Sequence, residues 1–153
     1  MKQLSIVKQL KSEEETLAFA AQFAKAITSG ATVFLEGVLG AGKTTFVRGI
    51  LRGFGFQGKV KSPTYALLEP YEIDHHKLFH FDFYRINHAK ELQYIGIEDY
   101  FLPEFICLVE WAEKGEDHLP MPDLLCEFII KKNIRELTVT AKTKRGEEML
   151  GKL

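Results

Sequence analysis

The chain has 153 residues, of which 46% are hydrophobic and 27% are charged, and its formal net charge is −1. We expect one domain spanning residues 1–153, because a chain of this length buries one substantial core. The balanced charge excludes a general attraction to nucleic acid or to an anionic membrane. No apolar stretch is long enough to cross a bilayer, and the polar start lacks the apolar segment of a signal peptide. A cytoplasmic location is therefore expected.

The first expected element is a helix that begins after residue 12. Ser12 and Glu15 have the spacing of a capping box, in which the serine caps the helix and the glutamate lies three residues later. Gly30 is a plausible end of this helix. Between these limits, apolar side chains recur at helical spacing: Leu17, Phe19, Ala20, Phe23, Ala24 and Ile27.

Residues 37–44 read G-V-L-G-A-G-K-T and match the phosphate-binding loop G-x-x-x-x-G-K-[ST]. Gly37 and Gly42 let the backbone turn tightly, so that successive N–H groups converge on phosphate oxygens. Lys43 brings a positive charge to the β- and γ-phosphates, and the Thr44 hydroxyl is placed to bind Mg²⁺. The sequence therefore predicts nucleotide contacts from the loop and from the start of the next helix: Gly37, Leu39, Gly40, Ala41, Gly42, Lys43, Thr44 and Thr45.

The segments on either side of the loop support this interpretation. Residues 31–36 are β-branched and aromatic and predict a strand directly before it. Residues 44–52 predict a helix directly after it, and the glycine-rich segment 53–58 ends that helix. The apolar side chains of the helix share one face: Phe46, Val47, Ile50 and Leu51. Strand, loop and helix form the context that the motif requires, whereas a glycine-rich turn without a ligand does not need it.

Two strands at residues 65–71 and 77–84 are predicted to pair through a polar turn at residues 72–76. In the second strand two sets of side chains alternate: Phe79, Phe81 and Phe83 on one face, and Leu78, His80, Asp82 and Tyr84 on the other. We expect one aromatic, buried face and one face polar enough to line a site or to meet solvent.

The second half of the chain completes an α/β pattern. Short helical pieces are expected at residues 89–94 and 97–101. The continuous apolar run at 105–109 is typical of a parallel strand that is covered on both faces, and two more strands are expected at 124–131 and 135–141. The predicted fold class is a single α/β P-loop NTPase domain. Its central sheet is mixed or mainly parallel and is flanked by helices, with the phosphate-binding loop at the carboxyl edge.

Two carboxylates are candidates for the remainder of a Mg²⁺-nucleotide site. Mg²⁺ chemistry at such a loop needs an acid opposite Thr44, usually at the end of a buried strand. Glu110 ends the apolar run, and we therefore expect it on the Mg²⁺ side. Asp82 lies on the polar face of its strand and is expected to be a catalytic or water-ordering residue. The alternative for Asp82 is a surface position paired with Arg85 or with a lysine.

A third candidate lies in the segment K-S-P-T-Y at residues 61–65. Pro63 fixes the backbone there and Thr64 offers a hydroxyl, as in loops that respond to the γ-phosphate and Mg²⁺. The same residues also fit an ordinary turn. Trp111 follows Glu110 and is expected to pack against the phosphate-binding loop, against a partner, or in the core.

The histidines and cysteines do not predict a metal site. Cys107 and Cys126 lie inside apolar runs, so we expect buried, reduced thiols. His75, His76 and His80 are close in sequence, and His76 and His80 could share one strand face. No compact set of histidines and cysteines completes a metal site, which favours polar turn and strand residues instead.

Five blocks of the sequence occur together in a recognisable order. They are G-x-L-G-A-G-K-T-T from Gly37, K-S-P-T-Y from Lys61, H-F-D-F-Y-R from His80, E-L-x-x-x-G-I-x-D-Y-F from Glu91 and L-V-E-W from Leu108. This combination resembles the TsaE family, also called YjeE. The resemblance extends over about residues 12–135 and is far more specific than the phosphate-binding loop alone.

The resemblance implies an ATPase that is weak by itself and that associates with the TsaD–TsaB pair. That pair transfers a threonylcarbamoyl group to adenosine 37 of tRNAs that read ANN codons. ATP binding and hydrolysis by the TsaE subunit support multiple turnover rather than the transfer itself. The implied cofactors are ATP and Mg²⁺, the tRNA is reached through the complex, and neither a membrane nor DNA is an expected partner.

The family's site residues carry over to positions of this chain that match its motifs. Lys43 and Thr44 hold phosphate and Mg²⁺, Glu110 is the second Mg²⁺ contact, and Thr64 and Asp82 belong to the switch-like segment and the H-F-D motif. Two further residues are implied to lie near the nucleotide: Glu13, before the first helix, and Arg135, near the last strands. The expected reaction is in-line attack of water on the γ-phosphate, which Asp82 helps to organise or couples to the partner.

The chain departs from the family pattern at two positions. Val38 stands where family members usually carry Asp, which leaves the fixed glycine, lysine and threonine positions untouched but removes any role of that carboxylate in tuning hydrolysis or in partner contact. Phe83 replaces a more usual leucine in the core.

Two other uses of the loop remain as alternatives. A small-molecule kinase would need an acceptor pocket and an arginine-bearing lid, but Arg135 and Arg145 are the only arginines after Pro103. A GTP-dependent switch would need N-K-x-D or T-K-x-D to recognise guanine, and neither occurs. Direct tRNA binding lacks a clear basic stripe.

Overall fold

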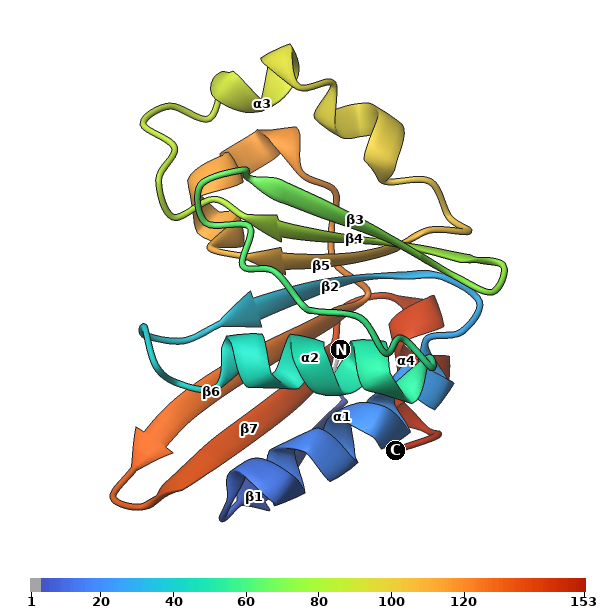
Figure 1. Cartoon of the computed structure of the whole chain (residues 1–153), viewed down its shortest axis with the longest axis vertical. Helices are drawn as coiled ribbons and strands as arrows, with labels where there is room; N and C mark the ends of the chain where they lie inside the picture. The colour runs from blue at the N-terminus through green and yellow to red at the C-terminus, as the bar shows by residue number, and fades with distance from the viewer. Residues whose placement is uncertain (1–3) are drawn as a thin grey trace.

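The computed structural model describes residues 4–153, apart from the side chain of Glu116. Its centre is one seven-stranded sheet with the order β1-β7-β6-β2-β5-β4-β3 (Figure 1). The strands are β1 (Ser5–Leu10), β2 (Ala31–Glu36), β3 (Leu68–Ile73), β4 (His76–Asp82), β5 (Ile106–Glu110), β6 (Leu124–Lys131) and β7 (Ile134–Ala141). The helices are α1 (Glu13–Ala26), α2 (Lys43–Gly53), α3 (Glu91–Tyr94) and α4 (Lys144–Leu150), with 3₁₀ helices η1 (Ile97–Tyr100) and η2 (Ala112–His118). None of the helices in these residues could span a membrane.

Four neighbouring strands in the middle of the sheet are parallel. β2 pairs in parallel with β5 and β6, and β5 pairs in parallel with β4. The outer pairs, β6 with β7, β7 with β1 and β4 with β3, are antiparallel. The predicted α/β domain with a mixed sheet is therefore confirmed, and the carboxyl ends of β2, β4 and β5 meet at one edge.

The sheet has a separate hydrophobic core on each face. The larger core joins the sheet to α1, α2 and α4, whereas the smaller one joins β4 and β5 to α3, η1 and η2 (Figure 1). β5 shows why both faces are apolar, since Ile106 and Leu108 belong to the first core and Cys107 and Val109 to the second. This explains the uninterrupted apolar run that predicted this strand.

The first helix begins as its capping pattern predicts. Ser12 Oγ accepts a hydrogen bond of 3.1 Å from the Glu15 backbone N–H, and Glu15 Oε1 accepts one of 3.3 Å from the Lys11 backbone N–H. The helix ends at Ala26, shortly before Gly30. The second helix covers the predicted residues, with Phe46, Val47, Ile50 and Leu51 fully buried.

The predicted hairpin exists, but its boundaries differ from the prediction. β3 begins at Leu68 rather than at Tyr65, because residues 63–67 form a turn in which Leu67 N–H donates to Pro63 O. β4 ends at Asp82 rather than at Tyr84, because Asp82 Oδ1 accepts a hydrogen bond from Tyr84 N–H, as in an Asx turn. Of the two environments expected for the polar face of β4, a site or solvent, the structure excludes solvent, because Leu78, His80 and Asp82 are buried.

Three elements have no counterpart in the sequence-based expectations. β1 is a largely exposed edge strand, η2 follows Trp111 directly, and α4 closes the described chain. The short pieces α3 and η1 lie within the predicted helical segments, and β6 and β7 match the last two predicted strands. Cys107 and Cys126 are buried and free, as expected.

Candidate functional site

The phosphate-binding loop connects β2 to α2 and uses glycines where the backbone requires them. Gly37 has φ of 149°, and a Cβ there would lie 2.9 Å from the Phe128 carbonyl oxygen on the neighbouring β6. Gly42 has φ of 108° and precedes the first residue of α2, while Phe46 N–H donates to its carbonyl and starts the helix. No atom lies within 4 Å of a Cβ built on Gly42, so this side of the loop is open to a ligand.

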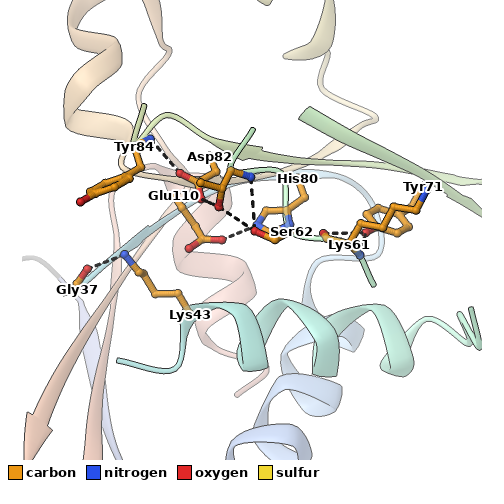
Figure 2. Close-up of polar contacts among 10 residues, drawn as sticks. Gly37, Lys43, Lys61, Ser62, Tyr71, His80, Asp82, Tyr84 and Glu110 are labelled. Carbon is orange, nitrogen blue, oxygen red and sulfur yellow. Dashed lines mark hydrogen bonds and ion pairs between the residues drawn. The ribbon is translucent and has the colours of Figure 1, made fainter. Parts of the chain in front are cut away.

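Lys43 lies inside the loop and is almost completely buried. Its ammonium group donates a hydrogen bond of 2.6 Å to the Gly37 carbonyl oxygen (Figure 2) and lies 4.3 Å from the centre of the Trp111 ring. Trp111 has a positive φ of 58°, which turns the chain sharply after β5 and brings the ring over Lys43. Trp111 therefore packs against the loop and also against the smaller core, two of the three expected environments.

A cavity of about 210 Å³ brings the predicted residues together. It is lined by residues of the loop and of the start of α2, and by Thr64, Asp82, Glu110 and Trp111. Asp82 and Glu110 are paired across the neighbouring parallel strands β4 and β5, so their side chains emerge side by side at the carboxyl edge. Mg²⁺ prefers hydroxyl and carboxylate oxygens as ligands. Such oxygens are present around one cavity, from Thr44, Asp82 and Glu110.

Asp82 is held by two hydrogen bonds. Its Oδ2 accepts a bond of 3.1 Å from Thr64 Oγ1, and its Oδ1 accepts one of 2.9 Å from Tyr84 N–H (Figure 2). Thr64 Oγ1 also lies 2.8 Å from Ser62 Oγ. The alternative of a surface position paired with Arg85 is wrong, because Asp82 is buried and Arg85 instead donates to the hydroxyl of Tyr65.

Glu110 has a buried partner that the sequence interpretation missed. His80 Nε2 lies 2.6 Å from Glu110 Oε2, and the side chains are 0% and 5% exposed (Figure 2). The alternation in β4 already indicates that His80 and Asp82 share a face, but only the pairing of β4 with β5 brings the imidazole to Glu110.

Among the described residues, no group of three or more His, Cys, Asp and Glu side chains could hold a metal ion.

A second cavity of about 250 Å³ lies against the loop, on the side of α1 and β7. It is lined in part by Glu13, Arg135, Gly40, Gly42 and Thr45, so both residues that the resemblance implied lie at the loop. An ion pair joins Glu13 to Arg48 of α2, and Arg135 donates to the Gly40 carbonyl oxygen at 3.5 Å.

A larger cavity of about 860 Å³ lies between residues 86–90 and η2. Its lining contains none of the predicted site residues, and its size alone gives it no chemistry. The site is therefore assigned to the cavities of about 210 Å³ and 250 Å³, both of which border the phosphate-binding loop.

One carboxyl group beside the loop is electrostatically perturbed. Burial, reinforced by Glu113 and Glu127, raises the pKa of Glu36, while Lys142 and Lys43 oppose this rise. Glu36 immediately precedes Gly37, so this carboxyl group lies at the base of the loop.

Comparisons with known proteins agree with this architecture. The family model described as "Threonylcarbamoyl adenosine biosynthesis protein TsaE" matches residues 10–140. A Haemophilus influenzae protein named tRNA threonylcarbamoyladenosine biosynthesis protein TsaE is 41% identical over 95% of this chain and 96% of its own. A Bacillus subtilis protein of the same name is 38% identical over 96% of this chain and 95% of its own.

A solved structure shows the same fold. The crystal structure of Bacillus subtilis YdiB superimposes with a TM-score of 0.85 at 32% sequence identity, and it covers 99% of this chain and 95% of its own. Because the family model and these relatives extend over most of its length, the chain belongs to the TsaE family of threonylcarbamoyl adenosine biosynthesis proteins.

Proposed function

We propose that this protein is the ATP-binding and ATP-hydrolysing component of the machinery that forms threonylcarbamoyladenosine at position 37 of tRNA. In this role it supports turnover of the TsaD–TsaB transferase in the cytoplasm. The observation that carries the proposal is the single cavity in which the phosphate-binding loop, Thr44 and two buried carboxylates from neighbouring strands meet. The family names of its relatives supply the pathway.

The residues divide the work of ATP binding. Lys43 exchanges its hydrogen bond with the Gly37 carbonyl for the phosphates, and the N–H groups at the start of α2 contribute the positive end of the helix dipole. Thr44 and Glu110 hold Mg²⁺, which neutralises charge on the phosphates. Glu13 and Arg135 border the adjacent cavity, where they contact the nucleoside side of ATP.

Asp82 and Thr64 form the part of the site that responds to the γ-phosphate. Thr64 Oγ1 donates to Asp82 and lies in the turn before β3, so the hydroxyl and the carboxylate are positioned together. Asp82 orients the attacking water or couples hydrolysis to the partner proteins through this contact. The loop amides and Lys43 stabilise the charge that develops during in-line attack.

The test is ATP hydrolysis by the purified protein, alone and with a matched TsaD–TsaB pair. We expect the pair to stimulate hydrolysis and Lys43→Ala to lose both nucleotide binding and the stimulated rate. Lys25→Ala removes an exposed lysine near the end of α1 and should behave as the wild type. An absence of binding and stimulation by the pair would overturn the proposal, and phosphorylation of an added metabolite would favour a small-molecule kinase instead.

A further inference from the structure

His80 is a buried side chain beside the site to which no role has been assigned. It is 0% exposed, and its Nε2 lies 2.6 Å from Oε2 of Glu110. Its other ring nitrogen, Nδ1, is the only buried side-chain N or O atom without a hydrogen-bond partner among residues 4–153 (Glu116 aside). A buried imidazole costs free energy unless its polar atoms are satisfied, so the contact with Glu110 is what favours a histidine here.

The sheet brings this pair together through the register of two strands. Asp82 lies opposite Glu110 in the β4–β5 pairing, and His80 lies opposite Leu108. His80 is thus the diagonal neighbour of Glu110 on the same face, a separation that a long side chain spans. Phe83 N–H donates to the carbonyl oxygen of Glu110 and holds the end of β5, while the imidazole of His80 holds one oxygen of the Glu110 carboxylate.

We infer that His80 is a positioning residue for Mg²⁺ binding, which donates its Nε2–H to Glu110 Oε2 and so leaves Oε1 for the cavity. This inference rests on the proposed role of Glu110 as a Mg²⁺ contact. The oxygen ligands of a metal are commonly fixed by such outer hydrogen bonds, and losing one typically lowers metal affinity about 10- to 100-fold. Glu110 lines the cavity, and its second oxygen is the one that His80 does not hold.

The unpartnered Nδ1 also defines the tautomer of the ring. Nε2 must carry the proton in order to donate to a carboxylate oxygen. Nδ1 then bears only a lone pair, which is less costly to bury without a partner than an N–H group. The proton of the bond to Glu110 is therefore assigned to Nε2 in the arrangement that positions this carboxylate.

The test compares His80→Leu, which removes the donor, with His80→Gln, which keeps an N–H group at a similar distance from the backbone. Calorimetry measures binding of a non-hydrolysable ATP analogue in EDTA and at increasing Mg²⁺. Mg²⁺ should increase the affinity for the analogue, and we expect His80→Leu to raise the Mg²⁺ concentration that gives half of this increase about tenfold. Binding of the analogue in EDTA should be unchanged. His80→Gln should restore most of the loss, and His80→Leu should have no added effect in a Glu110→Gln background.

The matched control is His76→Leu, which alters the same strand where the ring packs against Phe54. It should leave the Mg²⁺ dependence at the wild-type value. An unchanged Mg²⁺ dependence in folded His80→Leu would overturn the inference while leaving the proposed function intact. Failure of the wild type itself to bind the analogue would overturn both.

A measurement on the wild-type protein keeps the inference testable if His80→Leu does not fold. ¹⁵N NMR of the histidine rings should show a protonated Nε2 and an unprotonated Nδ1 for His80, with a shift of both when Mg²⁺ and the analogue are added together. A protonated Nδ1 with a bare Nε2 would contradict the proposed donation, as would signals that do not respond to Mg²⁺.

Discussion

The hydrogen bonds of Asp82 bear directly on its proposed role. Both of its oxygens already accept hydrogen bonds, one from Thr64 and one from the backbone of Tyr84. It therefore ends β4, holds the turn that carries Thr64 and faces the cavity, all with one carboxylate. A substitution at this position changes the shape of the site as well as its charge.

Asp82→Ala should retain ATP binding and lose hydrolysis, because Lys43, Thr44 and Glu110 do not depend on this carboxylate. We expect the rate to fall by about 100-fold or more, the usual effect of losing a group that acts in proton transfer or water orientation. The dissociation constant of ATP should change less than about threefold, which corresponds to a loss of less than about 0.7 kcal/mol in binding free energy. Steady-state hydrolysis and calorimetry measure the two quantities.

Asp82→Asn separates charge from shape, because its amide oxygen can still accept one of the two hydrogen bonds. It should be as inactive as Asp82→Ala while holding the Thr64 turn better. Asp99→Ala, at an exposed carboxylate of η1, is the matched control. ATP binding that weakens as much as the rate falls would mean that Asp82 acts in binding, contrary to this division of roles.

At the scale of elements, the close packing of α1 against α2 fixes the helix that carries the phosphate-binding loop. A Cβ on Gly49 would lie 2.5 Å from Ala20 Cβ and 3.2 Å from the Leu17 backbone, and a Cβ on Gly53 would lie 2.8 Å from Ala24 Cβ. Small residues thus face small residues along the contact. The backbones approach closely, and this closeness sets the position of α2 on the sheet.

Gly49→Ala should destabilise the protein, although alanine is the better helix former. The gain in helix propensity is about 1 kcal/mol, whereas overpacking a tight contact costs about 1–3 kcal/mol. We expect a net loss of about 1 kcal/mol in the free energy of unfolding, measured by urea denaturation. Arg52→Ala, at an exposed position of the same helix, should change it by less than about 0.5 kcal/mol. A more stable Gly49→Ala would show that α1 moves aside at little cost.

The boundaries of β3 and β4 illustrate the limit of period-two patterns. Alternation continues through Phe83 and Tyr84, yet the strand stops at Asp82, because the Asx turn with Tyr84 captures the backbone N–H. Apolar and aromatic residues likewise suggested a strand from Tyr65, but the turn at residues 63–67 delays it to Leu68. In both cases a local side-chain or backbone hydrogen bond overrides the pattern.

At the scale of the whole molecule, the sheet separates two apolar cores, each of which contains one thiol. Cys126 lies in the larger core and Cys107 in the smaller one, where its Sγ donates to the Tyr100 carbonyl. Burial raises the pKa of Cys107 from 9.0 to about 12 and also raises the pKa of Cys126, whose rise Glu127 reinforces. Neither thiol should react readily with alkylating agents in the folded protein near neutral pH.

These thiols should make the folded protein less stable in alkali. The folded state holds each proton more tightly than the unfolded state, so the stabilisation is complete below pH 9 and is lost as pH rises from 9 toward 12. Each thiol should lower the free energy of unfolding by roughly 1 kcal/mol per pH unit in that window. Urea denaturation at pH 8 to 10.5 measures the slope.

The matched comparison is the double variant Cys107→Ala/Cys126→Ala. It should be less stable at pH 8, because two buried side chains are shortened, but its stability should decline less steeply with pH. Equal slopes in the two proteins would mean that other groups, such as tyrosines, dominate the alkaline loss.

The sequence by itself determined the parts of this protein that depend on neighbours along the chain. The phosphate-binding loop, the capped start of α1 and the apolar run of β5 follow from spacing, hydrogen-bonding side chains and periodicity within a few residues. The α/β class followed from the same local signals. The exposed edge strand β1 gave no such signal, because its apolar and polar residues do not alternate and its order comes from pairing with β7.

Only the tertiary structure decided which of these parts meet. The order of β2, β5 and β4 brings Asp82 beside Glu110 and brings His80 to the same carboxylate, although about thirty residues separate them in the chain. The contact of Trp111 with Lys43 and that of Arg135 with the loop also join segments that are far apart in the sequence. Local patterns report the conformation of a segment, whereas contacts between distant segments depend on how the strands are ordered and registered when both cores are buried.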